Sequence, residues 1–131
     1  MREARAISDT ITKEERESGS RFLPKFDAAG LLTAVVQDSE SREVLMVAFM
    51  DRKALDATLS TGLAHFHSRS RGTLWCKGET SGNTLTVEQV LVDCDQDALV
   101  LLVRPAGPTC HTGARSCLFR RLENGKLVPV S

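Results

Sequence analysis

The sequence lacks a long apolar run, and none reaches the roughly 18 residues that a transmembrane helix requires. Its first 20 residues are charged and also lack the apolar stretch of a secretory signal peptide. We therefore expect a cytoplasmic protein with no membrane partner. In that reducing compartment the four cysteines are expected to bind metal or take part in catalysis rather than to form disulfides.

An excess of charge of one sign is also absent, because 17 lysines and arginines balance 17 aspartates and glutamates. The chain as a whole therefore has no electrostatic attraction for nucleic acid or for anionic membranes, and neither is expected as a partner. Its 131 residues, 41% of them hydrophobic, are enough for one packed core. We expect a single domain over residues 21–131, preceded by an N-terminal arm at 1–20 that is mobile or forms a marginal helix.

Short apolar runs separated by turn residues dominate the chain and predict an α+β, mainly β domain with mixed or antiparallel sheets. Asp51 is suited to begin one short helix, and Gly62 is suited to end it. The segment from Leu118 onward is expected to add one short strand. The other strands are expected at residues 31–37, 44–50, 64–68, 73–76, 85–92 and 98–103.

The segment Asp93-Cys94-Asp95-Gln96-Asp97 places three carboxylates and one thiol within five residues. Carboxylates suit hard ions such as Mg²⁺, whereas thiolates suit Zn²⁺, so one metal would not use all four groups. In an extended segment side chains alternate, and the three aspartates would share one face while Cys94 lies on the other. The segment thus predicts two metal sites of different hardness; a solvated acidic turn is the alternative.

Two familiar metal-binding patterns are absent. The aspartates do not begin an EF-hand, because its sixth position is Ala98 rather than glycine and its twelfth is Arg104 rather than glutamate. The cysteines do not form a zinc ribbon, because no CxxC pair occurs. Three widely spaced thiols, Cys94, Cys110 and Cys117, would leave one coordination position open, as in a catalytic zinc; buried and inert cysteines are the alternative.

His111 directly follows Cys110 and is the candidate general base beside such a metal. Three thiolates would leave a zinc site formally negative, so it should acidify water less than a site with histidine ligands, and a nearby base becomes useful. An ordinary loop histidine is the alternative. Cys76 is expected to be a structural thiol, and His65 and His67 are expected to be half-exposed strand residues.

Two polar segments are suited to an anionic substrate. The loop at 77–82 (KGETSG) lacks the residue order of a P-loop, yet its backbone N–H groups and hydroxyls could face an anion. Arg69 and Arg71 add guanidinium groups suited to phosphate. Either segment alone is also compatible with an ordinary polar turn. Together with two metal sites, they indicate a phosphorylated small-molecule substrate.

These motifs together resemble the phosphoribosyl-AMP cyclohydrolase family of histidine biosynthesis. The resemblance covers about residues 22–120, which is nearly the whole chain. After Gly82 the family often has histidine and, two positions later, glutamine, where this chain has Asn83 and Leu85. The matching stretches are residues 68–71, 74–75, 77–82, 93–98, 107–113 and 116–117.

The resemblance implies hydrolytic opening of the adenine ring of N1-(5-phosphoribosyl)-AMP, in which water adds at C6 and the N1–C6 bond breaks. It further implies one zinc per subunit, with ligands from both subunits of an intertwined homodimer, and magnesium at the aspartates. Because no second domain follows before Ser131, it also implies a monofunctional enzyme. The implied zinc ligands are Cys94, Cys110 and Cys117, the magnesium ligands are Asp93, Asp95 and Asp97, and the substrate contacts are Arg69, Arg71, Trp75, Lys77, Glu79, Thr80 and Ser81.

Two other functions fit parts of the sequence. A nucleobase deaminase would also direct water at a purine carbon, but the H-x-E…P-C-x-x-C signature of zinc deaminases is absent. A metal-stabilised binding module would use the thiols only to hold its fold. Release of ammonia from a nucleotide would identify the first, and unfolding on chelation would identify the second.

Overall fold

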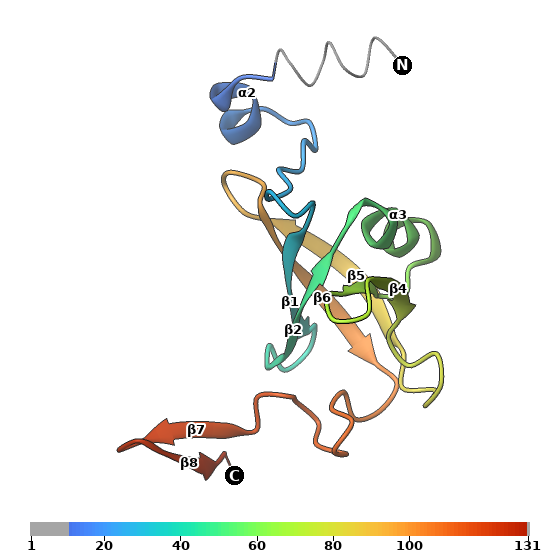
Figure 1. Cartoon of the computed structure of the whole chain (residues 1–131), viewed down its shortest axis with the longest axis vertical. Helices are drawn as coiled ribbons and strands as arrows, with labels where there is room; N and C mark the ends of the chain where they lie inside the picture. Colours follow the sequence, from blue (N-terminus) through green and yellow to red (C-terminus); the bar gives the residue numbers. More distant parts are fainter. Residues whose placement is uncertain (1–10, 131) are drawn as a thin grey trace.

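The computed structural model describes residues 11–130. These residues form two helices and eight strands, arranged as one four-stranded sheet and two separate two-stranded hairpins (Figure 1). The α+β, mainly β class is therefore confirmed. A second helix joins the one expected after Asp51, and it lies in the N-terminal arm, where a marginal helix was the alternative to a mobile segment. The elements are α2 (Lys13–Ser18), β1 (Leu32–Asp38), β2 (Val44–Met50), α3 (Arg52–Thr61), β3 (His65–Ser68), β4 (Thr73–Cys76), β5 (Leu85–Val92), β6 (Ala98–Pro105), β7 (Arg120–Glu123) and β8 (Lys126–Pro129).

The additional helix, α2, lies within the predicted N-terminal arm and begins at a capping box. The backbone N–H of Glu15 donates to the hydroxyl of Thr12 at 3.0 Å, and the N–H of Thr12 donates to the Glu15 carboxylate at 3.2 Å. This reciprocal pair satisfies two N–H groups that a helix start otherwise leaves unpaired. One of the charged residues of this arm, Glu15, therefore forms part of a helix cap. Residues 1–10 of the arm lie outside the described residues.

The four-stranded sheet has the order β2-β1-β6-β5 and is mixed. β1 pairs antiparallel with β2 and parallel with β6, and β6 pairs antiparallel with β5. Val35 at the centre of β1 lies opposite Val47 and Val100. The β5–β6 loop is therefore at the end of the sheet where β1 begins, and the chain leaving β6 is at the other end (Figure 1).

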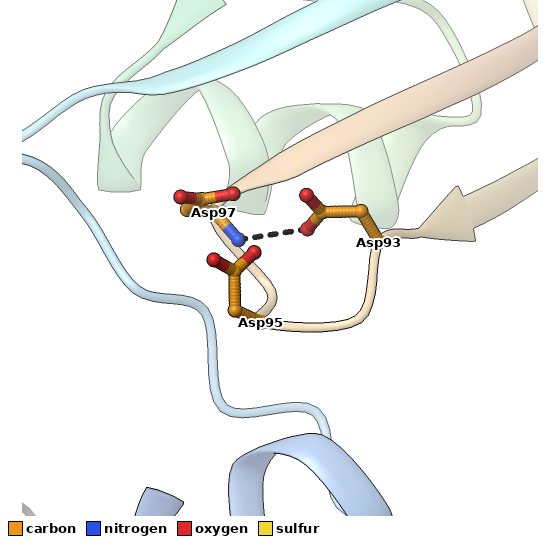
Figure 2. A group of neighbouring side chains, drawn as sticks. All are labelled: Asp93, Asp95 and Asp97. Atoms are coloured by element: carbon orange, nitrogen blue, oxygen red, sulfur yellow. Dashed lines mark hydrogen bonds between the residues drawn. The ribbon is translucent and has the colours of Figure 1, made fainter.

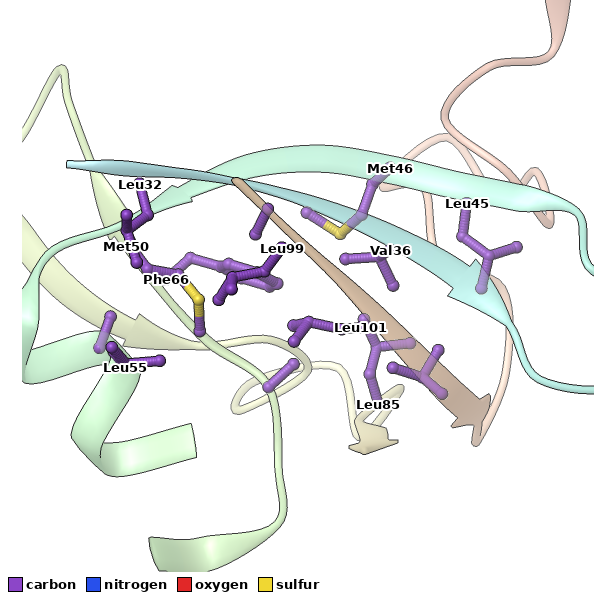
Figure 3. Close-up of a cluster of buried hydrophobic side chains, with 14 residues drawn as sticks. Leu32, Val36, Leu45, Met46, Met50, Leu55, Phe66, Leu85, Leu99 and Leu101 are labelled. Atoms are coloured by element: carbon purple, nitrogen blue, oxygen red, sulfur yellow. The ribbon is translucent and has the colours of Figure 1, made fainter. Parts of the chain in front are cut away.

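One face of this sheet carries the hydrophobic core. Alternate residues of β1 are fully buried, as period-two patterning predicts, and they pack with side chains from β6, α3 and β3 (Figure 3). Phe66 of β3 is the largest of the fully buried side chains, and its ring lies 5.4 Å from that of Trp75 in β4. The core thereby holds β4, which carries the predicted substrate residue Trp75, against the sheet.

The helix expected after Asp51 is confirmed. The Asp51 carboxylate accepts from the N–H of Ala54 at 2.9 Å, and Gly62 ends the helix with a left-handed φ of 79°. Ala54, Leu55 and Thr58 face the core. This helix covers the same sheet face as the β3–β4 hairpin.

The opposite face of the sheet is not covered by any part of the chain that the structure describes. Val47 is 48% exposed, and Leu91 is 42% exposed. A shallow groove on this face is lined almost entirely by apolar residues of β1, β5 and β6, including Val35 and Val100. Such a contiguous apolar area is characteristic of a surface that meets another protein chain.

The C-terminal segment forms a hairpin of two strands, β7 and β8, so the expectation of one strand there is wrong. The hairpin projects away from the sheet (Figure 1), and Leu122 is 74% exposed and Leu127 58% exposed. An isolated two-stranded hairpin is marginally stable in water, so these leucines indicate a missing packing partner. Among the described residues, neither helix is long and apolar enough to cross a membrane.

Candidate functional site

The β5–β6 loop, residues 93–97, gathers three carboxylates. One oxygen from each of Asp93, Asp95 and Asp97 can be chosen so that all three lie within 4.8 Å of one another (Figure 2). Within residues 11–130 this is the one group of three or more potential ligand side chains with such spacing. We call residues 93–97 the aspartate loop; its oxygen-only donor set is the kind that suits a hard cation.

The aspartate loop is a turn, so the expected alternation of faces in an extended segment is wrong. Asp93 Oδ1 accepts from the N–H groups of Asp97 at 3.0 Å and Ala98 at 3.1 Å. Gln96 has a left-handed φ of 60°, which reverses the chain. The three carboxylates converge because the chain turns around them. The same turn leaves the Cys94 thiol outside the group of carboxylates.

Hydrogen bonds among its carboxyl groups shift the titration of this loop. The pKa of Asp97 is raised to about 6, chiefly because its carboxyl shares a proton with Asp95 and then with Asp93. The same shared hydrogen bond lowers the pKa of Asp95. One carboxyl of the loop is therefore harder to ionise than an ordinary aspartate, and it gains a proton as the pH falls through about 6.

The buried side chain of Gln96 attaches the aspartate loop to the N-terminal segment. Its Oε1 accepts from the N–H of Leu23 at 2.6 Å, and its Nε2 donates to the carbonyl oxygens of Arg16 and Arg21 at 2.8 and 3.2 Å. The N–H of Lys25 donates to the Gln96 carbonyl at 2.7 Å. Sequence reasoning missed this residue, because its partners lie more than 70 positions away.

The three predicted zinc ligands do not meet within one chain. Cys94 is exposed in the aspartate loop, whereas Cys110 and Cys117 lie beyond the far end of β6 (Figure 1). The eight residues of β6 that separate the two places span roughly 25 Å. A single chain therefore brings two of the three thiols together.

Cys110 and Cys117 are held in a loop, residues 109–117, which we call the thiol loop. The hydroxyl of Ser116 donates to the carbonyl of Val44 at 2.7 Å, and the N–H of Cys117 donates to that of Leu45 at 2.7 Å. These bonds fix the loop to the start of β2. The two thiols are close enough to shift each other's pKa.

The thiol loop prepares Cys110 for ligation. The hydroxyl of Thr112 donates to Cys110 Sγ at 3.0 Å and lowers the pKa of this thiol, and Cys117 and Lys77 also contribute. Burial and the neighbouring Cys110 raise the pKa of Cys117. Thr112 is a second residue whose role sequence reasoning missed, although the family motif at 107–113 includes it. His111, the predicted base, is exposed in this loop.

Five of the seven predicted substrate residues line one pocket of about 240 Å³: Arg71, Trp75, Glu79, Thr80 and Ser81. Lys77 lies outside that lining, with Nζ 5.8 Å from the Trp75 ring. Its charge is near enough to the thiol loop to favour the thiolate form of both cysteines, although burial and Cys110 leave the pKa of Cys117 raised. Arg69 is also outside it, with its guanidinium carbon 4.0 Å from the centre of the Phe49 ring.

The remaining predicted residues have local structural contacts. Cys76 is half-buried, and burial and then the Glu79 charge raise its pKa, consistent with a structural thiol. The Glu79 carboxylate accepts from the N–H of Cys76 at 2.7 Å. His65 and His67 are half-buried on β3, as expected. Leu85, where the family often has glutamine, is fully buried in the core.

Replacing Gly78 with alanine is expected to destabilise the chain and to deform the 240 Å³ pocket. Gly78 has a φ of 84°, and an added Cβ would lie 2.4 Å from the carbonyl carbon of Asn83. Strain at this φ alone costs on the order of 1–2 kcal/mol, and the backbone collision adds to it. Gly72→Ala is the matched control, because Gly72 has a φ of 65° and no atom within 4 Å of an added Cβ. Thermal unfolding that is equal in the two variants would contradict the collision.

Comparison with known proteins gives one consistent match. The family model described as phosphoribosyl-AMP cyclohydrolase matches residues 46–119. A protein of that name from Erythrobacter litoralis strain HTCC2594 is 70% identical over 120 residues, which is 92% of this chain and 96% of the relative. Relatives of the same name from Sphingopyxis alaskensis and Brucella anthropi are 62% and 58% identical over 84% and 88% of this chain, and over 87% and 84% of their own lengths. The chain belongs to the phosphoribosyl-AMP cyclohydrolase family.

Proposed function

We propose that this chain is a zinc-dependent cytoplasmic hydrolase that opens the adenine ring of N1-(5-phosphoribosyl)-AMP, the third step of histidine biosynthesis. The observation that carries the proposal is 70% identity to a phosphoribosyl-AMP cyclohydrolase along almost the full length of both chains. In this reaction the oxygen of water bonds to C6 and the N1–C6 bond breaks. C6 becomes a carboxamide carbon, and the proton lost by water is returned to N1.

The thiol loop fits half of a zinc site. Cys110 and Cys117 lie side by side, and the Thr112 hydroxyl and Lys77 stabilise a thiolate at Cys110. Zinc binds cysteine as the thiolate, so a lowered pKa favours ligation. When bound, zinc would act as a Lewis acid that makes an attacking water more acidic. A third thiolate is needed to match the family's donor set.

A second copy of the chain can supply that third thiolate. Cys94 is exposed at the opposite end of the sheet from Cys110 and Cys117, so a site with all three needs two chains. The uncovered apolar sheet face and the exposed leucines of the β7–β8 hairpin support a homodimer in which each chain reaches over the other. Each dimer then has two equivalent zinc sites, one per subunit.

His111 is proposed as the general base. It directly follows Cys110, a proposed zinc ligand. Its side chain is exposed and makes no hydrogen bond to another residue within the described part of the chain. At a dimer interface it would accept the proton of the attacking water and return it to N1 as the ring opens. The Trp75 face and the Arg71 guanidinium of the 240 Å³ pocket would hold the nucleotide.

The aspartate loop is proposed to bind Mg²⁺. Its three carboxylates fit a small hard cation by donor type. The raised pKa of Asp97 comes first from its hydrogen bonds with Asp95 and Asp93 and also from their charges, which a cation would offset. Because Cys94 stands between Asp93 and Asp95, an ion at the aspartates would also limit the motion of this thiol.

Lowering the pH below about 6 is expected to weaken Mg²⁺ binding. The pKa of Asp97 is raised to about 6 in the metal-free chain, so below that pH a proton must leave before the cation binds. The apparent affinity should fall by about tenfold for each further pH unit until the other aspartates also titrate. Calorimetric titrations at about pH 5 and about pH 7 measure this, with Asp97→Asn as the variant that loses the dependence. Equal affinity at both pH values in the unmodified chain would contradict the shared proton.

The experiment that tests the proposed function follows ring opening by absorbance. The zinc-loaded protein is expected to turn over N1-(5-phosphoribosyl)-AMP without releasing ammonia, because the ring bond rather than the exocyclic C–N bond breaks. Zinc-loaded protein with no turnover would overturn the proposal. Ammonia release from adenosine nucleotides would instead favour a deaminase.

A further inference from the structure

A second cleft lies at the aspartate end of the sheet, remote from the pocket lined by Arg71. It has a volume of about 360 Å³ and is formed between the N-terminal segment and the aspartate loop. In Figure 1, α2 lies next to this loop. Its charged lining is Arg16, Glu17 and Arg21 from the N-terminal segment and Asp93 from the loop, with Cys94 beside Asp93.

The wall of this cleft is held in place by buried contacts. Gln96, which is 6% exposed, binds the backbone of Arg16, Arg21 and Leu23. The Nε of Arg16 donates to the carbonyl of Leu23 at 2.9 Å, which orients its guanidinium group, and within residues 11–130 no hydrogen bond uses its terminal nitrogens. The two arginines are therefore attached to the loop that carries the proposed metal ligands.

The charge balance of the cleft decides which ligand it takes. The lining residues include two arginines and the two acidic residues Glu17 and Asp93. Asp93 Oδ1 already accepts two backbone N–H groups, and a cation on the aspartate loop would offset its charge. The positive charge of the two arginines then dominates the cleft. A guanidinium group can donate two parallel hydrogen bonds to two oxygens of one phosphate.

We propose that Arg16 and Arg21 bind one of the two phosphate monoesters of the substrate. This inference rests on the proposed function, because N1-(5-phosphoribosyl)-AMP carries one phosphate on each of its two ribose units. The pocket lined by Arg71 serves the other phosphate. In the proposed dimer, Cys94 of one chain meets the thiol loop and Lys77 of the other, so the two phosphates are held by different subunits.

The test compares arginine variants by steady-state kinetics with the zinc-loaded dimer. Arg21→Ala is expected to raise KM by about tenfold with kcat little changed, because a charge-assisted contact that is equal in ground and transition states is lost. Arg16→Lys should raise KM less, because lysine retains the positive charge but loses the two parallel N–H donors of the guanidinium group. Lys13→Ala is the matched control, because it removes a positive charge from the same helix outside the cleft.

Glu17→Gln gives the opposite expectation, since removing a carboxylate from the cleft should lower KM. Binding of AMP and of ribose 5-phosphate to the His111→Ala protein, measured by calorimetry, provides a readout independent of turnover. One of the two ligands should bind at least several-fold more weakly to the His111→Ala protein that also carries Arg21→Ala. An unmodified enzyme that turns over while Arg21→Ala leaves KM and both affinities unchanged would overturn this inference alone. Absence of turnover in the unmodified enzyme would instead overturn the proposed function.

Discussion

Replacing His111 with alanine is expected to lower kcat by about 10²–10⁴-fold while the zinc content per chain stays unchanged. The imidazole is exposed next to Cys110 and is the proposed acceptor of the proton from the attacking water. Its loss removes an interaction made in the transition state, so kcat and kcat/KM should fall together. Single-turnover kinetics and metal analysis of the same samples measure both quantities.

His65→Ala is the matched control for that variant. His65 lies on β3, where its Nδ1 is 2.8 Å from the carbonyl oxygen of Leu63, so its loss should leave kcat close to that of the unmodified chain. Added imidazole should restore part of the turnover of His111→Ala but not alter that of His65→Ala. Zinc lost in proportion to activity would show that His111 is a ligand or a structural residue rather than a base.

Replacing Cys117 with alanine is expected to remove both the zinc and the turnover. Outer-shell partners of a metal typically account for roughly 10–100-fold in affinity or activity, so the loss of a direct thiolate ligand should exceed that range. Cys76→Ala is the control, because its thiol lies outside the thiol loop and should leave the zinc content unchanged. Circular dichroism separates loss of metal from loss of fold. A Cys117→Ala protein that retains one zinc per chain would contradict the ligand assignment.

The strands and the α3 helix follow from short-range patterns, and for that reason they could be predicted. Alternating burial in β1 and the cap at Asp51 depend only on neighbouring residues. The capping box of α2 is equally local, and the pattern Thr12-x-x-Glu15 could have predicted it. The turn at residues 93–97 could not be predicted in the same way, because it depends on a left-handed Gln96 whose side chain is satisfied by distant backbone groups.

The candidate site likewise has features that local sequence predicts and features that depend on tertiary packing. The composition of the donor sets could be predicted from residue types, and the aspartates do converge. The distance between Cys94 and Cys110 depends on β6, which was predicted as a strand between them and keeps its two ends apart. Which pocket each arginine lines depends on tertiary packing, so Arg71 lines the 240 Å³ pocket while Arg69 packs on Phe49.

The central claim is that each zinc site takes Cys94 from one chain and Cys110 and Cys117 from the other. Chains carrying Cys94→Ala and Cys117→Ala can be co-expressed with different affinity tags and the heterodimer isolated by two successive purifications. One of its two sites then has all three thiols, so about half of the unmodified turnover and one zinc per dimer are expected, although each variant alone is inactive. If one chain supplied all three ligands, every site would lack a thiol, and a heterodimer as inactive as its parents would contradict the claim.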